Sequence, residues 1–367
     1  MNKIINYITY QTFPADTANS LQTISNLKYF VKNSYDVYLY FPLREKQSSD
    51  DLKILQEKYN FSETINIIGS DHPYPFGKFK RFKKIFYHIS HFLWAKKICK
   101  NFSSKSRRSE YFLTRSDWVF YFLAKKDLNI IFECHQYSKI RHFVFKKVSH
   151  LENTKIVFLN DFIKQEFGLF NIKSEIISSG VDLELFNNLH NITKVENKFI
   201  FVGNLLRFDK GRNLEFIFEG FKNLSNFELT IVGGPESESK KLNELVKKQG
   251  LTNIAIKGRL NRKDTIQEIM SSSYGLLINS EDKHSRLFTS PLKYFEYIAA
   301  DLKVIAVDYP SHNILPEQQN IFMFENNNLE SFEKSINDAS KHDFEHFEIE
   351  KYSLDNRVKK ILDLYLK

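Results

Sequence analysis

The segment Thr289–Ala299 places a carboxylate on the inward face of a short predicted helix. Ser290 is a residue type that caps helices, and Pro291 suits the first helical position because its missing N–H needs no partner there. Glu296 follows Leu292 by four residues and therefore falls on the same apolar face. A buried carboxylate is costly without a partner. Glu296 is thus expected either to pair with a backbone donor or basic side chain, or to accept hydrogen bonds from a ligand's hydroxyl groups.

The start of this helix has the properties of an anion site. Unpaired N–H groups and the positive end of the helix dipole favour a phosphate. We therefore predict that Ser290, Pro291, Leu292 and Lys293 bind a phosphate-bearing ligand. With Glu296 on a ribose diol, one short element would hold both parts of a nucleotide.

Two blocks of alternating strand and helix patterns would position these residues. Short apolar strands separated by helices predict parallel sheets that are covered on both faces. The strands predicted in the first block are Ile4–Thr9, Asp36–Tyr40, Tyr111–Thr114, Asn129–Cys134, Lys155–Leu159 and Glu175–Ile177. Those predicted in the second are Lys198–Gly203, Phe227–Val232, Asn253–Lys257, Tyr274–Asn279 and Lys303–Val307.

The predicted organisation is two doubly wound α/β domains that face a central crevice. The first covers residues 1–188, a polar, Asn-rich linker covers 189–197, and the second covers 198–350. Residues 351–367 contain a helix with apolar spacing that is expected to pack back on the first domain. In folds of this kind, ligands bind in the crevice outside the carboxyl ends of the strands.

Several polar or small residues follow predicted strands and would therefore lie at that edge. His135 and Arg115 end two strands of the first domain, and Asn19 lies in the loop after its first strand. In the second domain, Gly233 either lets a nucleotide approach the backbone or forms a tight turn.

Both domains resemble glycosyltransferase family 4, whose members have the GT-B fold. The resemblance rests on Thr289–Ala299, on Phe201–Gly211, and on the Glu-x-His of residues 133–135. It implies that Glu296 holds the ribose and that His135 lies near the donor sugar. These two are the residues to which the resemblance assigns the reaction centre.

The same resemblance assigns further contacts. It implies that Lys210 and Arg207, which follow Gly203, neutralise the donor diphosphate. Arg115 and Asn19 would contact phosphate, donor or acceptor, although a structural salt bridge explains Arg115 equally well.

The chain departs from the family pattern in several places. The arginine that usually follows the glycine is Asn204, so that Arg207 would supply the charge instead, and the loop after the first strand lacks the usual Gly-Gly pair. The second acidic residue of the motif is replaced here by Phe288, and Glu281 or Asp282 in the preceding loop are the candidates to substitute for it. An Asp-x-Asp metal motif is not evident, so we expect no metal and no cofactor, and cations would stabilise the departing diphosphate instead. The expected donor is a UDP- or GDP-linked sugar.

Composition and charge narrow the setting of this activity. The 367-residue chain is 42% hydrophobic and carries an excess of 53 − 44 = 9 basic residues, which suits an anionic partner. Two isolated cysteines, Cys99 and Cys134, indicate a reducing compartment, and the N-terminus lacks a signal-peptide pattern. We expect a cytoplasmic protein at the inner face of the membrane.

Lysines, arginines and aromatic residues are interleaved through Phe76–Arg108. A solvated surface helix, an interfacial helix on an anionic leaflet, and a single-strand nucleic-acid surface are the three interpretations. No nucleic-acid motif accompanies the stretch, so a nucleic-acid partner is not expected.

The function predicted from these features is a retaining, metal-independent glycosyltransferase of the hexosyltransferase type. Its acceptor would be a cell-surface polysaccharide, a glycan or a lipid-linked glycolipid precursor. Two alternatives remain: a GT-B nucleotide-sugar epimerase, and a non-catalytic membrane- or nucleic-acid-binding protein on a decayed transferase scaffold.

Overall fold

A computed structural model describes residues 3–76, 82–103, 110–169, 172–187, 189, 192–207 and 210–366, with Arg207 and Lys210 described by their backbone only. The chain forms two compact units. Unit 1 comprises Met1–Ser178 and Leu354–Lys367, and unit 2 comprises Ser179–Ser353. The second unit is therefore a continuous insertion between the body of the first and its final helix.

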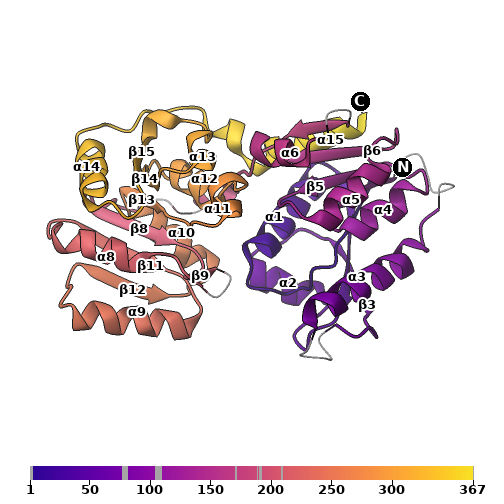
Figure 1. Ribbon diagram of the computed structural model, residues 1–367, viewed down its shortest axis with the longest axis horizontal. Helices are drawn as coiled ribbons and strands as arrows, with labels where there is room; N and C mark the ends of the chain where they lie inside the picture. The colour runs from indigo at the N-terminus through magenta and orange to yellow at the C-terminus, as the bar shows by residue number, and fades with distance from the viewer. Residues whose placement is uncertain are drawn as a thin grey trace. The chain divides into compact units, whose positions relative to one another are not determined.

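Unit 1, which carries the labels α1 to α6 and α15 in Figure 1, is built on a parallel sheet. Its strands lie in the order β3-β2-β1-β4-β5-β6-β7. The strands are β1 Lys3–Ile8, β2 Tyr35–Leu43, β3 Asn66–Asp71, β4 Glu110–Thr114, β5 Ile130–Cys134, β6 Thr154–Phe158 and β7 Ser174–Ile176. The helices are α1 Ala18–Lys32, α2 Leu52–Tyr59, α3 Lys83–Cys99, α4 Asp117–Ala124, α5 Lys139–Val148, α6 Asp161–Phe167 and α15 Leu354–Leu366.

Two helices of unit 1 hold residues that matter for the site. Helix α1 begins with a reciprocal cap, in which Ser20 N donates to Thr17 Oγ1 (3.0 Å) and Thr17 N donates to Ser20 Oγ (3.2 Å). Helix α15 buries Val358 and Ile361 in the core shared with β1 and α1. The cap thereby fixes the start of α1 locally, and the buried side chains of α15 hold that helix in the core of unit 1.

Unit 2 repeats the architecture with a parallel sheet in the order β12-β11-β8-β13-β14-β15 and a separate β10-β9 hairpin. The strands are β8 Lys198–Val202, β9 Leu206–Arg207, β10 Lys210–Gly211, β11 Glu228–Val232, β12 Ile254–Gly258, β13 Tyr274–Leu277, β14 Lys303–Val307 and β15 Ile321–Phe324. The helices are α7 Glu184–Asn187, α8 Leu214–Lys222, α9 Glu236–Lys248, α10 Arg262–Met270, α11 Lys283–Leu287, α12 Leu292–Ala299, α13 Pro310–Asn313 and α14 Leu329–Ser340, with 3₁₀ turns η1 Gln318–Asn320 and η2 Ile349–Tyr352.

The predicted fold class, two doubly wound α/β domains, is confirmed by these two parallel sheets. The predicted strands are present within a few residues of their expected bounds, whereas β3, β15 and the β9–β10 hairpin were not anticipated. Both β3 and β15 are edge strands, and β3 carries Gly69 and Asp71 in place of a continuous apolar run. Short or polar edge strands give little periodic signal in a sequence.

Candidate active site

The carboxyl edge of the unit 2 sheet brings two of the predicted glycines together. Gly203 follows β8, and Gly233 follows β11. A Cβ added to Gly233 would lie 1.9 Å from the carbonyl oxygen of Gly203, so no side chain fits there without moving the loop. The Gly233 N–H donates to Gly258 O (2.8 Å), which fixes the turn. Gly233 therefore has a structural reason to be glycine, whether or not a nucleotide also lies here.

Lys293 points from the first turn of α12 to the end of β8. Its ammonium group lies 4.5 Å from the ring centroid of Phe201, and a Cβ on Gly203 would be 2.6 Å from Lys293 Nζ. Gly203 and Lys293, both predicted from the sequence, therefore lie next to each other. A cation lies beside the glycine loop and close to a helix start.

The start of α12 differs from the expected cap. Pro291 is the cap residue and Leu292 the first helical residue, so the helix begins one residue later than predicted. The Ser290 hydroxyl instead accepts a hydrogen bond from Ser179 N (2.9 Å), and Ser179 Oγ donates to Ser290 O (2.7 Å). The hydroxyl that would have capped the helix is engaged by a neighbouring loop. Within the described residues no side chain caps α12, and in its first turn Tyr294 N donates to Pro291 O (3.1 Å). A helix start without a side-chain cap favours an anion through its dipole.

Glu296 is buried, as its position on the apolar face predicts. Its Oε1 accepts a hydrogen bond from Arg262 NH2 at 2.5 Å, and Arg262 lies at the start of α10. Of the two sequence interpretations, pairing with a basic side chain is therefore realised at this oxygen. A role for Glu296 on a ribose remains a prediction.

The cations predicted to follow β8 are described only in part. Lys210 pairs with Arg207 in the antiparallel β9–β10 hairpin, and the side chains of both lie outside the described part of the chain. Arg212, which the sequence analysis did not select, is described. Its NH1 donates to Asn279 Oδ1 (2.7 Å) just beyond β13. Arg212 directly follows Lys210 and Gly211, and this position in the sequence could have marked it as a candidate.

The acidic candidates near Phe288 have local partners. Phe288 itself is buried. Asp282 caps α11 by accepting from Ser285 N (3.1 Å) and from Ser285 Oγ (2.7 Å). Glu281 accepts a hydrogen bond from Asn326. Both carboxylates therefore have roles within their own loops, and the substitution of either for the missing acid remains a prediction.

At the carboxyl edge of unit 1, a buried carboxylate organises the predicted residues. Glu133, on β5, is 1% exposed. It accepts a hydrogen bond from Arg115 Nε (2.8 Å) and another from Arg357 NH2 on α15. His135 Nε2 lies 3.2 Å from Glu133 Oε1. Two guanidinium groups and one imidazole thus surround a single carboxylate.

Arg115 also joins Asn19 to this cluster. Its NH1 donates to Asn19 Oδ1, and its NH2 donates to Gln22 Oε1 at 3.3 Å. Three of the sequence-predicted residues, His135, Arg115 and Asn19, therefore belong to one network. Within it Arg115 acts as a structural ion pair, which is one of the two roles left open by the sequence.

The electrostatics of the cluster set the charge of His135. Burial alone would raise the pKa of Glu133, but Arg115, Arg357 and His135 hold it well below its ordinary value. Burial, reinforced by Arg115, lowers the pKa of His135 from 6.5 to about 4, against the attraction of Glu133. His135 is consequently neutral near pH 7 and suited to hydrogen bonding.

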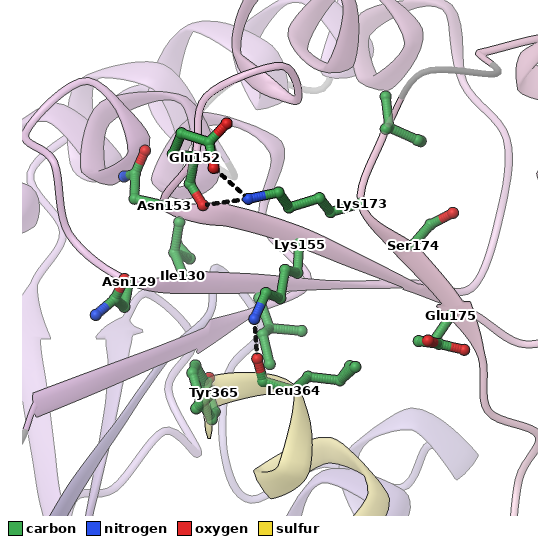
Figure 2. A pocket seen from close by; sticks show the side chains of 12 residues that line it. Asn129, Ile130, Glu152, Asn153, Lys155, Lys173, Ser174, Glu175, Leu364 and Tyr365 are labelled. Atoms are coloured by element: carbon green, nitrogen blue, oxygen red, sulfur yellow. Dashed lines mark hydrogen bonds and ion pairs between the residues drawn. The ribbon is translucent and has the colours of Figure 1, made fainter. Parts of the chain in front are cut away.

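The part of the chain that the structure describes has no group of three or more His, Cys, Asp or Glu residues able to hold a metal ion. One pocket of about 630 Å³ lies at the opposite, amino edge of the unit 1 sheet (Figure 2). Figure 2 shows that Lys173 is paired with Glu152 and that Lys155 donates to the carbonyl of Leu364. Because Lys173, Glu152 and Lys155 are engaged in these contacts and the predicted residues lie elsewhere, the pocket does not define the site.

Residues 196–342 match the family model of glycosyl transferases group 1. This stretch contains Gly203, Gly233, Lys293 and Glu296. The match lies within unit 2. The resemblance to this family and the prediction of a glycosyltransferase enzyme are confirmed by the match.

Solved structures show the same GT-B fold over the whole chain. Sucrose-phosphate synthase from Thermosynechococcus elongatus is 11% identical, with a TM-score of 0.70 and coverage of 100% of this chain and 98% of that one. A TarM mutant from S. aureus, solved with fondaparinux, alpha-GlcNAc-glycerol and UDP, is 10% identical, with a TM-score of 0.69 and full coverage, 100%, of both chains. UDP-GlcNAc 2-epimerase from Methanocaldococcus jannaschii is 9% identical, with a TM-score of 0.61 and coverage of 99% of each chain. At these identities the likeness concerns the fold. No curated protein matches the sequence.

Proposed function

We propose that the chain is a retaining, metal-independent glycosyltransferase that uses a UDP- or GDP-linked sugar. The observation that carries the proposal is the carboxyl edge of unit 2, inside the matched glycosyltransferase domain. There the uncapped start of α12 and the ammonium of Lys293 lie next to the glycine loop at Gly203. A nucleoside diphosphate needs this combination of N–H donors, positive charge and close backbone approach.

The reaction follows from where this charge lies. The bond between the anomeric carbon and the diphosphate oxygen breaks, and the acceptor hydroxyl oxygen forms the new bond to that carbon. Negative charge accumulates on the departing diphosphate, and the proton lost by the acceptor hydroxyl passes to that diphosphate or to solvent. Lys293 and the N–H groups of α12 would stabilise this charge. Lys210 and Arg207 are further candidates by family resemblance.

The roles of Glu296 and His135 complete the proposal. Glu296 would hold the ribose while the hydrogen bond from Arg262 orients its carboxylate. His135, neutral because of its surroundings, would donate or accept a hydrogen bond at the donor sugar. The acceptor would be a cell-surface polysaccharide, a glycan or a lipid-linked precursor, reached from a peripheral position at the inner face of the membrane.

Product analysis tests the proposal most directly. Purified protein is incubated with UDP- and GDP-sugars, with and without a lipid-linked or oligosaccharide acceptor, in the presence of EDTA. We expect sugar transfer only with acceptor, undiminished by EDTA, and with the anomeric configuration of the donor retained in the product by NMR. A change of the sugar with donor alone would identify an epimerase instead. Absence of nucleotide binding in calorimetry would indicate a non-catalytic protein.

A further inference from the structure

Helix α3 carries a stripe of exposed apolar side chains opposite its buried face. Phe82 at the helix start and Ile85, Ile89 and Leu93 along it are 59%, 56%, 45% and 38% exposed. Their spacing of three or four residues places them on one face. The opposite side of α3 is buried through Trp94 and its neighbours. Single exposed apolar residues are ordinary, whereas an aligned row of four requires an explanation.

The same outer layer is strongly basic. Helix α3 packs against α4, and α4 packs against α5, so the three helices form one layer of unit 1 (Figure 1). The exposed lysines of these helices and of the residues that end them are Lys83, Lys84, Lys96, Lys97, Lys100, Lys125, Lys139, Lys146 and Lys147. Asp117 is the sole acidic residue within α3, α4 and α5, and its carboxylate is held by Arg141 Nε at 2.6 Å. The exposed side chains of these three helices therefore include many lysines, and the acid within the helices is already paired.

Aromatic side chains on each of the three helices add to this apolar surface. Phe92 of α3 packs edge-on against Trp118 of α4, with ring centroids 4.9 Å apart, and both are half-buried. Phe143 of α5 is 51% exposed, and the ammonium of Lys147 lies 5.8 Å from its ring centroid. Aromatic rings between lysines suit the boundary between lipid headgroups and acyl chains.

We propose that the outer face of α3, α4 and α5 docks on a bilayer that contains anionic lipids. Lysines at this face would meet lipid phosphates, and the row from Phe82 to Leu93 would enter the acyl boundary. Charge complementarity alone would also admit a nucleic acid. The aliphatic side chains of Ile85, Ile89 and Leu93 decide between the two, because they cannot stack on bases as aromatic rings do and would gain burial only in lipid.

No helix among the described residues is long and apolar enough to cross a membrane. The proposed contact joins the surface of the bilayer to the outer face of α3, α4 and α5. It concerns unit 1 and does not depend on the transferase reaction proposed for the site, so the two can fail separately.

Vesicle sedimentation tests the docking surface. The full chain is mixed with vesicles of phosphatidylcholine alone or with about one third phosphatidylglycerol, in low and in high salt. We expect binding to the anionic vesicles that weakens as salt rises. Replacing Ile85, Ile89 and Leu93 together by Ser should reduce the partition coefficient at least about tenfold, and reversing Lys96 and Lys97 to Glu should act similarly.

Matched controls test whether vesicle binding depends on this surface or on any loss of an exposed apolar side chain or of positive charge. Ile54→Ser on α2 removes another exposed apolar side chain, and reversal of the exposed Lys247 and Lys248 to Glu on α9 repeats the charge change in unit 2. Both controls should keep vesicle binding, and all variants should keep the circular dichroism of the parent chain. Equal vesicle binding by the parent and the triple Ser variant would overturn the proposal. So would anisotropy titrations in which a single-stranded oligonucleotide binds and anionic vesicles do not.

Discussion

Arg357, on the last helix of the sequence, donates a hydrogen bond to the buried carboxylate of Glu133 at the end of β5. The same guanidinium donates through Nε to Ser178 O at 2.8 Å. Arg115 occupies the other side of Glu133. The carboxyl edge of unit 1 therefore depends on a residue that is more than two hundred positions away in sequence from its partner.

Removal of Arg357 should destabilise unit 1. Arg357→Ala leaves part of the charge of Glu133 unpaired in a buried place, and breaking one partner of a buried pair costs about 3–5 kcal/mol. Urea unfolding, followed by the near-ultraviolet signal, measures the loss. Lys360→Ala, an exposed change on the same helix, should stay within about 0.5 kcal/mol of the parent. Equal stability of the two variants would show that the contact contributes nothing.

The lowered pKa of His135 predicts a pH dependence of stability. The unfolded chain binds a proton at this imidazole near pH 6.5, whereas the folded chain does so only near the pKa of about 4. Its contribution is thus present above pH 6.5 and is lost as pH falls from 6.5 towards 4. In His135→Gln the free energy of unfolding should fall less steeply across this window, by up to about 3 kcal/mol in total. His150→Gln, at an exposed position, is the control, and parallel pH profiles for His135→Gln and the parent would contradict the prediction.

Lys293 should contribute to nucleotide affinity. Lys293→Ala removes the ammonium beside Gly203, and we expect the Kd for UDP or GDP to rise about tenfold or more, as for other charged hydrogen bonds. Lys263→Ala, an exposed lysine on α10, changes the net charge equally and should leave the Kd unchanged. Isothermal titration calorimetry measures both. Identical affinities would remove Lys293 from the proposed diphosphate site.

Glu296 and Arg262 can be separated by comparing their variants. If Glu296 holds a ribose, Glu296→Ala should reduce nucleoside diphosphate affinity about tenfold beyond any effect of Arg262→Ala. If the carboxylate serves only its ion pair, both variants should lose similar stability and keep the same affinity. Calorimetry and thermal unfolding on the two single variants and the double variant distinguish the cases.

Gly233→Ala should disturb the glycine loop. The added methyl group would meet the carbonyl oxygen of Gly203 at 1.9 Å, so the loop after β8 must move. We expect unit 2 to lose about 1–3 kcal/mol of stability and nucleotide affinity to fall. Gly211→Ala, where an added Cβ has no atom within 4 Å among the described residues, should have little effect on either. Full affinity in Gly233→Ala would show that the loop tolerates displacement.

The features that could be predicted from the sequence are those set by the local spacing of apolar residues. Strand runs such as Lys303–Val307 and the inward face that carries Glu296 follow from the spacing of apolar residues. It did not find Arg262 as the partner of Glu296, nor Arg357 as the partner of Glu133. Such pairs join distant segments, and a single sequence does not show which segments meet. The hydroxyl of Ser290 illustrates the same limit, because its partner Ser179 lies in a remote loop and not in the helix that Ser290 precedes.

The insertion of unit 2 before α15 has a consequence for synthesis. On the ribosome, β5 and Glu133 are made early, whereas Arg357 emerges only after the whole of Ser179–Ser353 has been translated. During that interval the nascent first unit lacks its final helix and one of the two arginines that neutralise its buried acid. Unit 2, by contrast, is continuous in sequence and has all its strands available before translation ends. The order in which the two units can mature is thus opposite to the order in which their first residues appear.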